Sequence, residues 1–305
     1  VLGIDTDHHV VEVEPGIVLD HLNAELRSTG LWYPVDVSTS AQATLGGMAG
    51  NNSCGSRSIA YGNMVHNVLG ARAWTADGQL HRFEKMENCT GRALEIGLQV
   101  QELARELAPE IEQRWPKVLR RVGGYNLDVF QNQNERPYTR DGSVNLAHLL
   151  VGSEGTLALT HSLRLQLSEL PRAKVLGVVN FPTFYKAMDS AQHIVRMGQS
   201  GGHEGTVLSA VELVDRTMIE LSLQNPAFAS TIRTALIGQP DAILLVEFSG
   251  ASKADLLPRM QALVELMGDL GLPGSVVQMV DDAPQKNLWE VRKAGLNIMM
   301  SLRGD

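Results

Sequence analysis

The stretch that decides the fold is Ser38–Gly62, which reads STSAQATLGGMAGNNSCGSRSIAYG. Glycine recurs in it among small polar residues. Glycine reaches positive φ values and lets another group approach the backbone closely. Successive exposed N–H groups in such turns form a concave surface that binds anions, usually phosphates. A second glycine-rich stretch, Val151–Thr160 (VGSEGTLALT), comes later in the chain. Two such turns, each beside an apolar strand pattern, predict one large bound cofactor.

The two phosphate signatures familiar from nucleotide-binding proteins do not occur. The chain has no GxGxxG that opens a helix after a first strand, and no GxxxxGK[ST]. A glycine-rich loop taken alone is more often structural than functional. A tight strand-to-helix turn, of the kind found in any α/β protein, is therefore the alternative explanation of the same residues.

Several motifs resemble those of one flavoprotein family and occur in that family's order. They are Pro34-Val35-Asp36, Ala43-Thr44-Leu45-Gly46-Gly47-Met48, Asn51-Asn52-Ser53-Cys54-Gly55, Tyr61-Gly62, Gly124-Tyr125-Asn126-Leu127, Leu149–Leu157 and Trp289-Glu290-Val291-Arg292. All but the last resemble an FAD-binding domain of the vanillyl-alcohol-oxidase type, and the last resembles the W-x-x-R motif of a substrate domain. The chain as a whole resembles the FAD-linked D-2-hydroxyacid dehydrogenases, which act on D-lactate, glycolate or D-2-hydroxyglutarate.

This resemblance implies an α+β fold in two domains. Residues 1–170 would form a partial FAD-binding domain, and residues 171–305 a ferredoxin-like α/β cap of the FAD-linked oxidase C-terminal type. One strand pattern ends and a new pattern begins at Leu170-Pro171. In the family an Arg-Gly-Gly-Gly-Thr-type loop precedes the glycine run, and a His-x-x-x-Gly-x-x-His segment follows later. Neither occurs between Val1 and Asp305, so we expect a fragment of a longer enzyme.

The resemblance also implies a non-covalent FAD site. Backbone N–H groups of Gly46, Gly47 and Gly55 would face the pyrophosphate, and the second glycine stretch would line the flavin from the other side. The expected cofactor-binding residues are Thr39, Ser40, Thr44, Gly46, Gly47, Asn52, Ser53, Gly55, Tyr61, Gly62, Gly152, Ser153, Gly155 and Thr156. Glu154 is not among them, because a carboxylate beside a pyrophosphate is unfavourable.

Arg292 is the expected substrate-binding residue. A 2-hydroxy acid presents a planar carboxylate, which a guanidinium can bind through two parallel charge-assisted hydrogen bonds. Such a grip would position the substrate Cα–H over the flavin N5 atom. The alternative is an arginine on an exposed helix surface, followed by Lys293.

The reaction also needs a base for the hydroxyl proton, and the sequence identifies no catalytic residue for it. His66, His148 and His161 lie near the cofactor motifs, but the nine histidines have no metal-ligand spacing, and we expect no metal site. The carboxylates of Glu212, Asp215 and Glu247 stand at the edges of apolar segments. Each would face either a substrate cleft or solvent.

Together these features predict an FAD-dependent oxidoreductase that converts a D-2-hydroxy acid, such as D-lactate or D-2-hydroxyglutarate, into the 2-keto acid. The hydride would pass to the flavin and then to an unknown electron acceptor. Two alternatives stay open: another flavin oxidase of the same fold that acts on an uncharged alcohol or sugar lactone, and a non-catalytic fragment that no longer binds FAD.

Bulk properties are compatible with this prediction. The chain has 305 residues, enough for two domains. Its net charge of -8 argues against a nucleic-acid surface, and no apolar run is long enough to span a membrane. Cys54 and Cys89 have no disulfide or CxxC pattern, so we expect a cytoplasmic location. A homo-oligomer is compatible with all of this.

Residue patterns predict the elements of the first domain. Strand residues Val11 and Val13 precede a helix with Leu19, Leu22 and Leu26, which stops near Gly30. A hairpin spans 68–75 and 80–83 around Asp77-Gly78. The pattern predicts a helix over 94–107, a long surface loop over 128–145 and a strand over 157–167. The expected buried leucines of that helix are Leu94, Leu98, Leu103 and Leu107.

In the second domain strands alternate with helices. We expect strands at 175–180, 207–211, 243–248 and 275–280, and helices at 183–197, 212–223 and 252–267. Ser252 is the expected N-cap of the last helix. This order is typical of a ferredoxin-like sheet with helices on one face.

Overall fold

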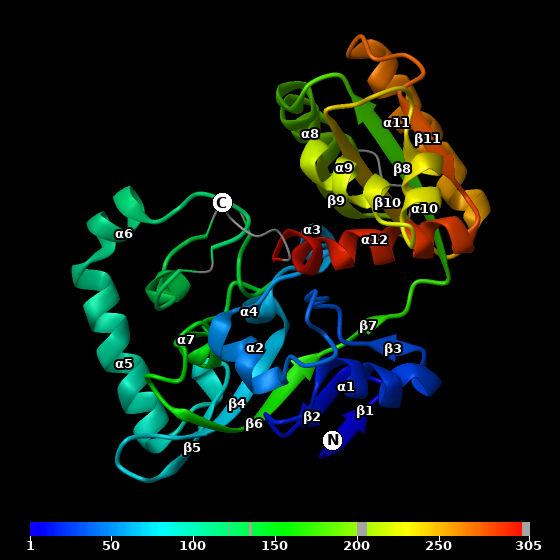
Figure 1. The fold of residues 1–305 in the computed structure, drawn as a ribbon. Coiled ribbons are helices and arrows are strands. Elements are labelled where there is room, and N and C mark those ends of the chain that lie inside the picture. Colours follow the sequence, from blue (N-terminus) through cyan, green and yellow to red (C-terminus); the bar gives the residue numbers. More distant parts are fainter. Residues whose placement is uncertain (122, 134–135, 200–205, 301–305) are drawn as a thin grey trace. The chain divides into compact units, whose positions relative to one another are not determined.

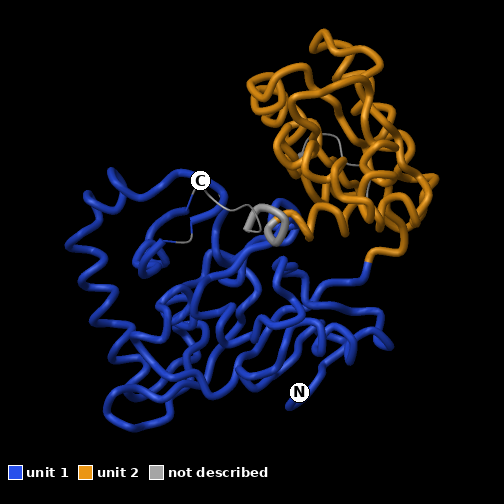
Figure 2. Tube along the Cα trace, in the orientation of Figure 1, with its two compact units in different colours: residues 1–170 blue, residues 171–305 orange. Residues whose placement is uncertain are grey.

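The computed structural model describes residues 1–121, 123–133, 136–199 and 206–300. The chain divides into two compact units, Val1–Leu170 and Pro171–Asp305 (Figure 2). Each unit has its own core, and each is described by itself.

Unit 1 is built on a five-stranded sheet with the order β1-β2-β6-β4-β5 (Figure 1). All of its pairs are antiparallel. Strands β3 and β7 form a separate antiparallel pair. The strands are β1 (Gly3–Asp5), β2 (Val10–Val13), β3 (Leu31–Trp32), β4 (Val68–Trp74), β5 (Leu80–Phe83), β6 (Leu159–Gln166) and β7 (Ser168–Glu169).

Short helices connect these strands and carry the glycine-rich segments. The helices are α1 (Leu19–Leu26), α2 (Leu45–Asn51), α3 (Ser58–Tyr61), α4 (Met64–Asn67), α5 (Gly91–Glu106), α6 (Ala108–Arg114) and α7 (Ala147–Leu150). Three 3₁₀ turns accompany them: η1 (Arg27–Thr29), η2 (Met86–Asn88) and η3 (Leu127–Phe130).

The local patterns at the start of unit 1 are confirmed. Leu19, Leu22 and Leu26 of α1 are all fully buried, and Gly30 ends the segment in the left-handed conformation, at φ 74°. The hairpin of β4 and β5 is also present, with Gly78 at φ 77° in its turn. Glycine reaches these φ values without the steric cost of a Cβ, which explains why glycine stands at the end of the helical segment and in the hairpin turn.

The burial predicted for the helix after this hairpin is wrong for three of its four leucines. Helix α5 forms and Leu94 packs partly buried against the core, but Leu98, Leu103 and Leu107 are exposed. The buried positions of α5 are Ala93, Gly97 and Ala104. A Cβ on Gly97 would lie 2.5 Å from a methyl of Leu146. The fully buried positions of the helix are therefore small residues that allow close approach, and Leu98 and Leu103 face outward.

Two further expectations in unit 1 need correction. Alternation along β6 holds for Leu163, Leu165 and Leu167, which are buried, but Leu157 and Leu159 at its start are exposed. The segment 128–145 is not purely a surface loop, because Asp128, Tyr138 and Asn145 in it are buried. Hydrogen bonds to other segments draw these polar side chains inward.

Unit 2 is a four-stranded antiparallel sheet with the order β11-β8-β10-β9. Its strands are β8 (Ala173–Phe181), β9 (Val207–Asp215), β10 (Ala242–Gly250) and β11 (Val276–Met279), and its helices are α8 (Phe184–Gln199), α9 (Arg216–Gln224), α10 (Ala229–Ala235), α11 (Lys253–Asp269) and α12 (Asp282–Met300). Numbered within the unit, the strand order is 4-1-3-2. This order confirms the predicted ferredoxin-like fold.

Helices cover both faces of this sheet, not one face as expected. Gly177 of β8 leaves room for Met260 and Leu263 of α11. Leu176 and Val178 point the other way and share a core cluster with Ile219 of α9, Ile232 of α10 and Leu288 of α12. Successive strand residues alternate between the two faces, so each helix group packs on one set of side chains.

The boundary between β9 and α9 also differs from the prediction. The strand continues to Asp215, whose side chain accepts a hydrogen bond from the Met218 N–H at 2.9 Å and caps α9. The predicted helix began at Glu212, so the sequence pattern placed this residue in the wrong element. Ser252 does cap α11, as expected.

Candidate functional site

The first glycine pair of the expected cofactor segment lies in the first turn of α2. Thr44 caps this helix, and its side chain accepts a hydrogen bond from the Gly47 N–H at 3.3 Å. The Gly46 N–H donates to the Pro15 carbonyl at 2.8 Å. A Cβ on Gly46 would lie only 2.5 Å from the Cβ of Pro15. Both N–H groups are thus engaged within the chain, and Gly46 is required for close packing.

Asp36 organises the loop that follows α2. Its carboxylate accepts hydrogen bonds from the Ser56 hydroxyl at 2.7 Å and the Arg57 N–H at 3.0 Å. It also forms an ion pair with the Arg57 side chain at 2.7 Å. A Cβ on Gly55 would meet Asp36 Oδ1 at 2.2 Å, and the Gly55 N–H donates to Ser58 Oγ. Asp36 is part of the Pro34-Val35-Asp36 motif of the sequence, but the motif alone assigns no role to its carboxylate.

The two glycine-rich segments meet in the folded chain. The Gly152 N–H donates to the Ala49 carbonyl, and the Glu154 N–H to the Gly50 carbonyl, each at 2.9 Å. The Asn51 side-chain amide donates to the Glu154 carboxylate at 3.0 Å. The end of α2 and the turn after α7 are therefore joined by both backbone and side-chain hydrogen bonds.

An exposed polar rim lies along this junction. Gly152, Glu154 and Gly155 have φ values of 84°, 52° and 73°. The N–H groups of Gly152 and Glu154 are bound to carbonyls of α2, so these left-handed residues shape the turn and do not themselves present donors to a ligand. A Cβ on Gly155 would have no atom within 4 Å, so the turn faces open space. The Thr156 and Tyr125 hydroxyl groups lie 2.9 Å apart beside it. These residues fit the oxygen-rich groups of a dinucleotide such as FAD.

Other expected cofactor residues have mainly structural partners. Asn52 is almost fully buried; its side chain donates to the Arg121 carbonyl and accepts from the Val65 N–H. Ser153 is buried and donates to the Leu150 carbonyl at 2.7 Å. Ser53 donates to the Asn51 side chain at 3.1 Å. These contacts hold the two segments in shape.

The remaining expected residues lie on either side of the junction. Thr39 is exposed, and Ser40 is half-buried with its carbonyl bound to the Asp20 N–H. Tyr61 packs edge-on against Trp32, with the ring centroids 5.4 Å apart. Gly62 has a φ of 77°. Thr39 and Ser40 thus precede α2 in the chain, and Tyr61 and Gly62 follow it.

A buried polar network lies behind the junction, and sequence reasoning missed it. The Asn126 amide donates to the carbonyls of His148 and Val151 at 2.9 Å. The Arg136 guanidinium binds the carbonyls of Ser58 and Ile59. Arg136 thus ties its own segment to the end of the first glycine segment, and Asn126 supports the second. No spacing rule links residues so far apart in the sequence.

The two histidines in this network are held neutral. Burial lowers the pKa of His148 to about 4, and its Nε2 lies 3.0 Å from the Val68 carbonyl. Burial, together with Arg136, lowers the pKa of His66 to about 3. His66 Nδ1 accepts a hydrogen bond from the Asn63 N–H at 3.0 Å. Both rings therefore serve the packing of unit 1.

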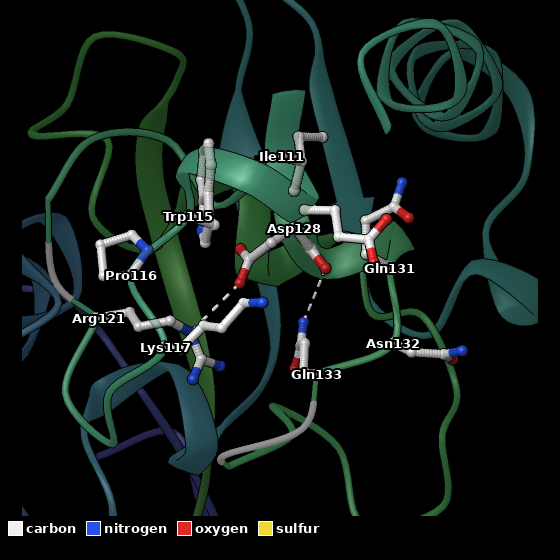
Figure 3. Close-up of a pocket in the computed structure, with 10 residues that line it drawn as sticks. Ile111, Trp115, Pro116, Lys117, Arg121, Asp128, Gln131, Asn132 and Gln133 are labelled. Carbon is white, nitrogen blue, oxygen red and sulfur yellow. Dashed lines mark hydrogen bonds and ion pairs between the residues drawn. The ribbon is translucent and has the colours of Figure 1, made fainter. Parts of the chain in front are cut away.

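A hollow of about 360 Å³ lies beside α6 and η3 (Figure 3). One wall is Asp128, whose carboxylate oxygens accept from the Tyr138 hydroxyl at 3.0 and 3.1 Å. Arg121 Nε lies 3.3 Å from the same carboxylate. Burial raises the pKa of Asp128, and the Tyr138 hydrogen bond counters part of this effect. Asp128 and Arg121 in this hollow are thus already paired with each other.

In unit 2, Arg292 of α12 forms an ion pair with Glu212 of β9. Arg292 Nη2 donates to Glu212 Oε2 at 2.6 Å. The Arg292 side chain is 39% exposed and that of Glu212 is 18% exposed. Lys174 Nζ and the buried Glu247 form a second pair at 3.8 Å. The guanidinium expected to grip a substrate carboxylate is therefore held by a carboxylate of the chain itself.

Metal sites and membrane-spanning helices are two further features to consider in the part of the chain that the structure describes. Within the described residues, no group of three or more histidine, cysteine, aspartate or glutamate side chains is arranged to hold a metal ion. Within the same residues, no helix has both the length and the apolar character that a membrane crossing needs.

Curated proteins similar to this chain carry dehydrogenase names. A D-2-hydroxyglutarate dehydrogenase of Pantoea ananatis is 29% identical over 100% of this chain and 30% of its own length. A probable mitochondrial D-lactate dehydrogenase of Danio rerio is 28% identical over 99% of this chain and 48% of its own length. The chain thus spans between about a third and a half of these relatives.

Structure and family comparisons agree with the fold. A solved alkyldihydroxyacetonephosphate synthase covers 98% of the chain with a TM-score of 0.64 at 16% identity, while the chain covers 44% of that structure. The model of the FAD binding domain matches residues 1–84, and that of the FAD linked oxidases, C-terminal domain, matches residues 170–304. The chain therefore has an FAD-binding domain followed by the C-terminal domain of the FAD-linked oxidases.

Proposed function

We propose that this chain carries the FAD and substrate sites of an enzyme that oxidises a D-2-hydroxy acid, such as D-lactate or D-2-hydroxyglutarate, to the 2-keto acid. The observation that carries the proposal is the junction of the two glycine-rich segments, through the Gly152 and Glu154 N–H groups. The names of the relatives support the substrate class.

The rim of the junction would hold FAD without a covalent bond. Thr156 and Tyr125 offer hydroxyl groups, and Gly155 lets the backbone approach the ligand. The engaged N–H groups of Gly46, Gly47 and Gly55 favour a supporting role for these three glycines. The other expected cofactor residues stay predictions of the motif.

The reaction removes two electrons and two protons from the substrate. The C–H bond at Cα breaks with its electron pair as a hydride, the hydroxyl loses a proton, and a C=O bond forms. The chemistry that bound FAD would supply is uptake of this hydride, and the acceptor that would later receive the electrons is not identified by this chain. Burial lowers the pKa of His66 to about 3 and that of His148 to about 4. Each ring is therefore a weak base, which argues against either as the base for the hydroxyl proton.

Arg292 would bind the substrate carboxylate. Its side chain is partly exposed, and Glu212 contacts it at one guanidinium nitrogen, Nη2. A guanidinium has five N–H donors, and the substrate would use two parallel ones, including that of the nitrogen which Glu212 now binds. A planar two-point contact of this kind would select for hydroxy acids over uncharged alcohols.

The visible absorbance spectrum of the purified chain tests this function. We expect a flavin band after FAD is added, and bleaching of that band when D-lactate or D-2-hydroxyglutarate is added without oxygen. If an uncharged alcohol bleaches the flavin band, and the Arg292→Lys variant is bleached to the same extent, the chain would instead belong to a different flavin oxidase. A chain that takes up no FAD would be a non-catalytic fragment.

Two expectations are separate from this chemistry. A cytoplasmic location and a homo-oligomeric state stay predictions. Cell fractionation with an antibody to the chain checks the first, and sedimentation of the purified protein checks the second.

A further inference from the structure

The ion pair between Glu212 and Arg292 raises a question that the proposed function does not answer. Arg292 is the expected carboxylate-binding residue, yet Glu212 Oε2 already lies 2.6 Å from its Nη2. A glutamate carboxylate has the same charge and the same planar geometry as the carboxylate of a hydroxy acid. It therefore offers Arg292 the same hydrogen bonds as the substrate would.

The surroundings of this pair limit the negative charge that it can accept. Glu212 lies opposite Leu245 in the sheet, and Glu247 lies opposite Ala210. Residues two apart on one strand share a face, so Glu212 and Glu247 are diagonal neighbours, with Cα atoms roughly 7–8 Å apart. Leu245 belongs to the core cluster that includes Leu288 of α12. Both acids thus lie on the face that α12 covers.

Two ion pairs lie on this face. Glu212 is paired with Arg292, and Glu247 with Lys174. A substrate carboxylate on Arg292 would place a third carboxylate beside these two pairs. Like charges this close repel each other in a partly desolvated site. One of the two glutamates must therefore move away or lose affinity for its partner.

Burial decides which glutamate moves. The Glu247 side chain is only 1% exposed, so turning it toward water would disrupt the core. Glu212 is 18% exposed, and its partner Arg292 is 39% exposed. A pair with this much access to solvent is held weakly compared with a buried one. Glu212 can therefore turn into water at small cost.

We propose that Glu212 is an internal competitor: its carboxylate occupies the substrate-binding face of Arg292 and is displaced when a hydroxy acid binds. This inference rests on the proposed function, in which Arg292 binds the substrate carboxylate. Glu212 then holds Arg292 in place between turnovers and lowers the affinity for every carboxylate ligand.

The test is the affinity of the 305-residue chain for oxalate, measured by calorimetry. Oxalate has carboxylates but no C–H bond to oxidise, so it reports binding without turnover. We expect Glu212→Gln to bind oxalate about tenfold more tightly than the parent chain, and Arg292→Lys to bind it at least tenfold more weakly. Glu220→Gln is the matched control, because Glu220 is an exposed glutamate of the same unit. It should leave the affinity unchanged.

The outcomes separate this inference from the proposed function. Tighter oxalate binding in Glu212→Gln, without bleaching of the flavin by any hydroxy acid, would support the competitor and refute the dehydrogenase. Bleaching by a hydroxy acid, with oxalate binding weakened or unchanged in Glu212→Gln, would support the dehydrogenase and show that Glu212 only positions Arg292. Absence of oxalate binding in the parent chain and in Glu212→Gln would overturn the inference as well.

Discussion

The Gly152 N–H donates a hydrogen bond to the carbonyl oxygen of Ala49 across 2.9 Å. This bond joins segments that are about a hundred residues apart in the chain. It fixes the turn after α7 against the end of α2, and with it the rim that Gly155, Thr156 and Tyr125 form. The FAD site that we propose therefore depends on the packing of unit 1 as much as on the exposed donors.

The close approach at Gly46 predicts a stability defect. In Gly46→Ala the new Cβ would lie 2.5 Å from the Cβ of Pro15, so the turn or the helix must shift. Overpacking of this kind costs about 1–3 kcal/mol. We expect a corresponding loss in the free energy of unfolding, measured by urea denaturation. Gly16→Ala is the control, because a Cβ there meets nothing within 4 Å. Equal stability of the two variants would contradict the packing role.

Asp36 should matter for the loop after α2. Asp36→Asn removes the ion pair with Arg57, in which both side chains are 16% exposed, and it weakens the hydrogen bonds from Ser56 and the Arg57 N–H. Hydrogen bonds to charged groups contribute about 1.5–3 kcal/mol each, so we expect a loss of that order in the free energy of unfolding.

The control for this variant is Asp141→Asn. Asp141 also pairs with a basic residue, Lys85, but its side chain is 54% exposed. Exposed ion pairs contribute little to stability, so the denaturation midpoint of this variant should stay close to that of the parent chain. An Asp36→Asn midpoint that also stays there would show that the loop holds itself by other contacts.

Local patterns and motifs in the sequence predicted much of this molecule. The leucines of α1, the stop at Gly30, the hairpin around Gly78 and the strand order of unit 2 all depend on short-range periodicity or on one recognised fold. The outward leucines of α5 were missed because a helix that packs through Gly97 has the same periodicity as one that packs through leucine. The Glu212–Arg292 pair was missed for another reason. It joins residues 80 apart in the sequence, and the helix boundary was drawn at Glu212.

The proposed rim predicts a specific loss of cofactor affinity. Tyr125→Phe removes the hydroxyl that lies 2.9 Å from the Thr156 hydroxyl. Because Tyr125 is 50% exposed, folding should change little. Loss of one hydrogen bond to the ligand corresponds to about 1 kcal/mol, so we expect the Kd for FAD to rise about fivefold. Quenching of flavin fluorescence during titration measures this Kd. Tyr185→Phe, at another exposed tyrosine, is the control, and a matching Kd in both variants would remove Tyr125 from the site.

The buried histidines predict acid sensitivity of unit 1. Burial lowers the pKa of His148 from 6.5 to about 4, so between these pH values the unfolded chain binds a proton that the folded chain does not. Stability is therefore complete above pH 6.5 and falls as the pH decreases toward 4. A shift of this size corresponds to roughly 3 kcal/mol. We expect the free energy of unfolding, measured by urea denaturation between pH 7.5 and 4.5, to fall as the pH decreases.

The variant His148→Gln tests the origin of this pH dependence. Its slope should be shallower by up to about 1.4 kcal/mol per pH unit, because the titrating group is gone. His21→Gln, at an exposed histidine, should keep the slope of the parent chain. If His148→Gln keeps it as well, the proton uptake arises elsewhere, with His66 as the next group to replace.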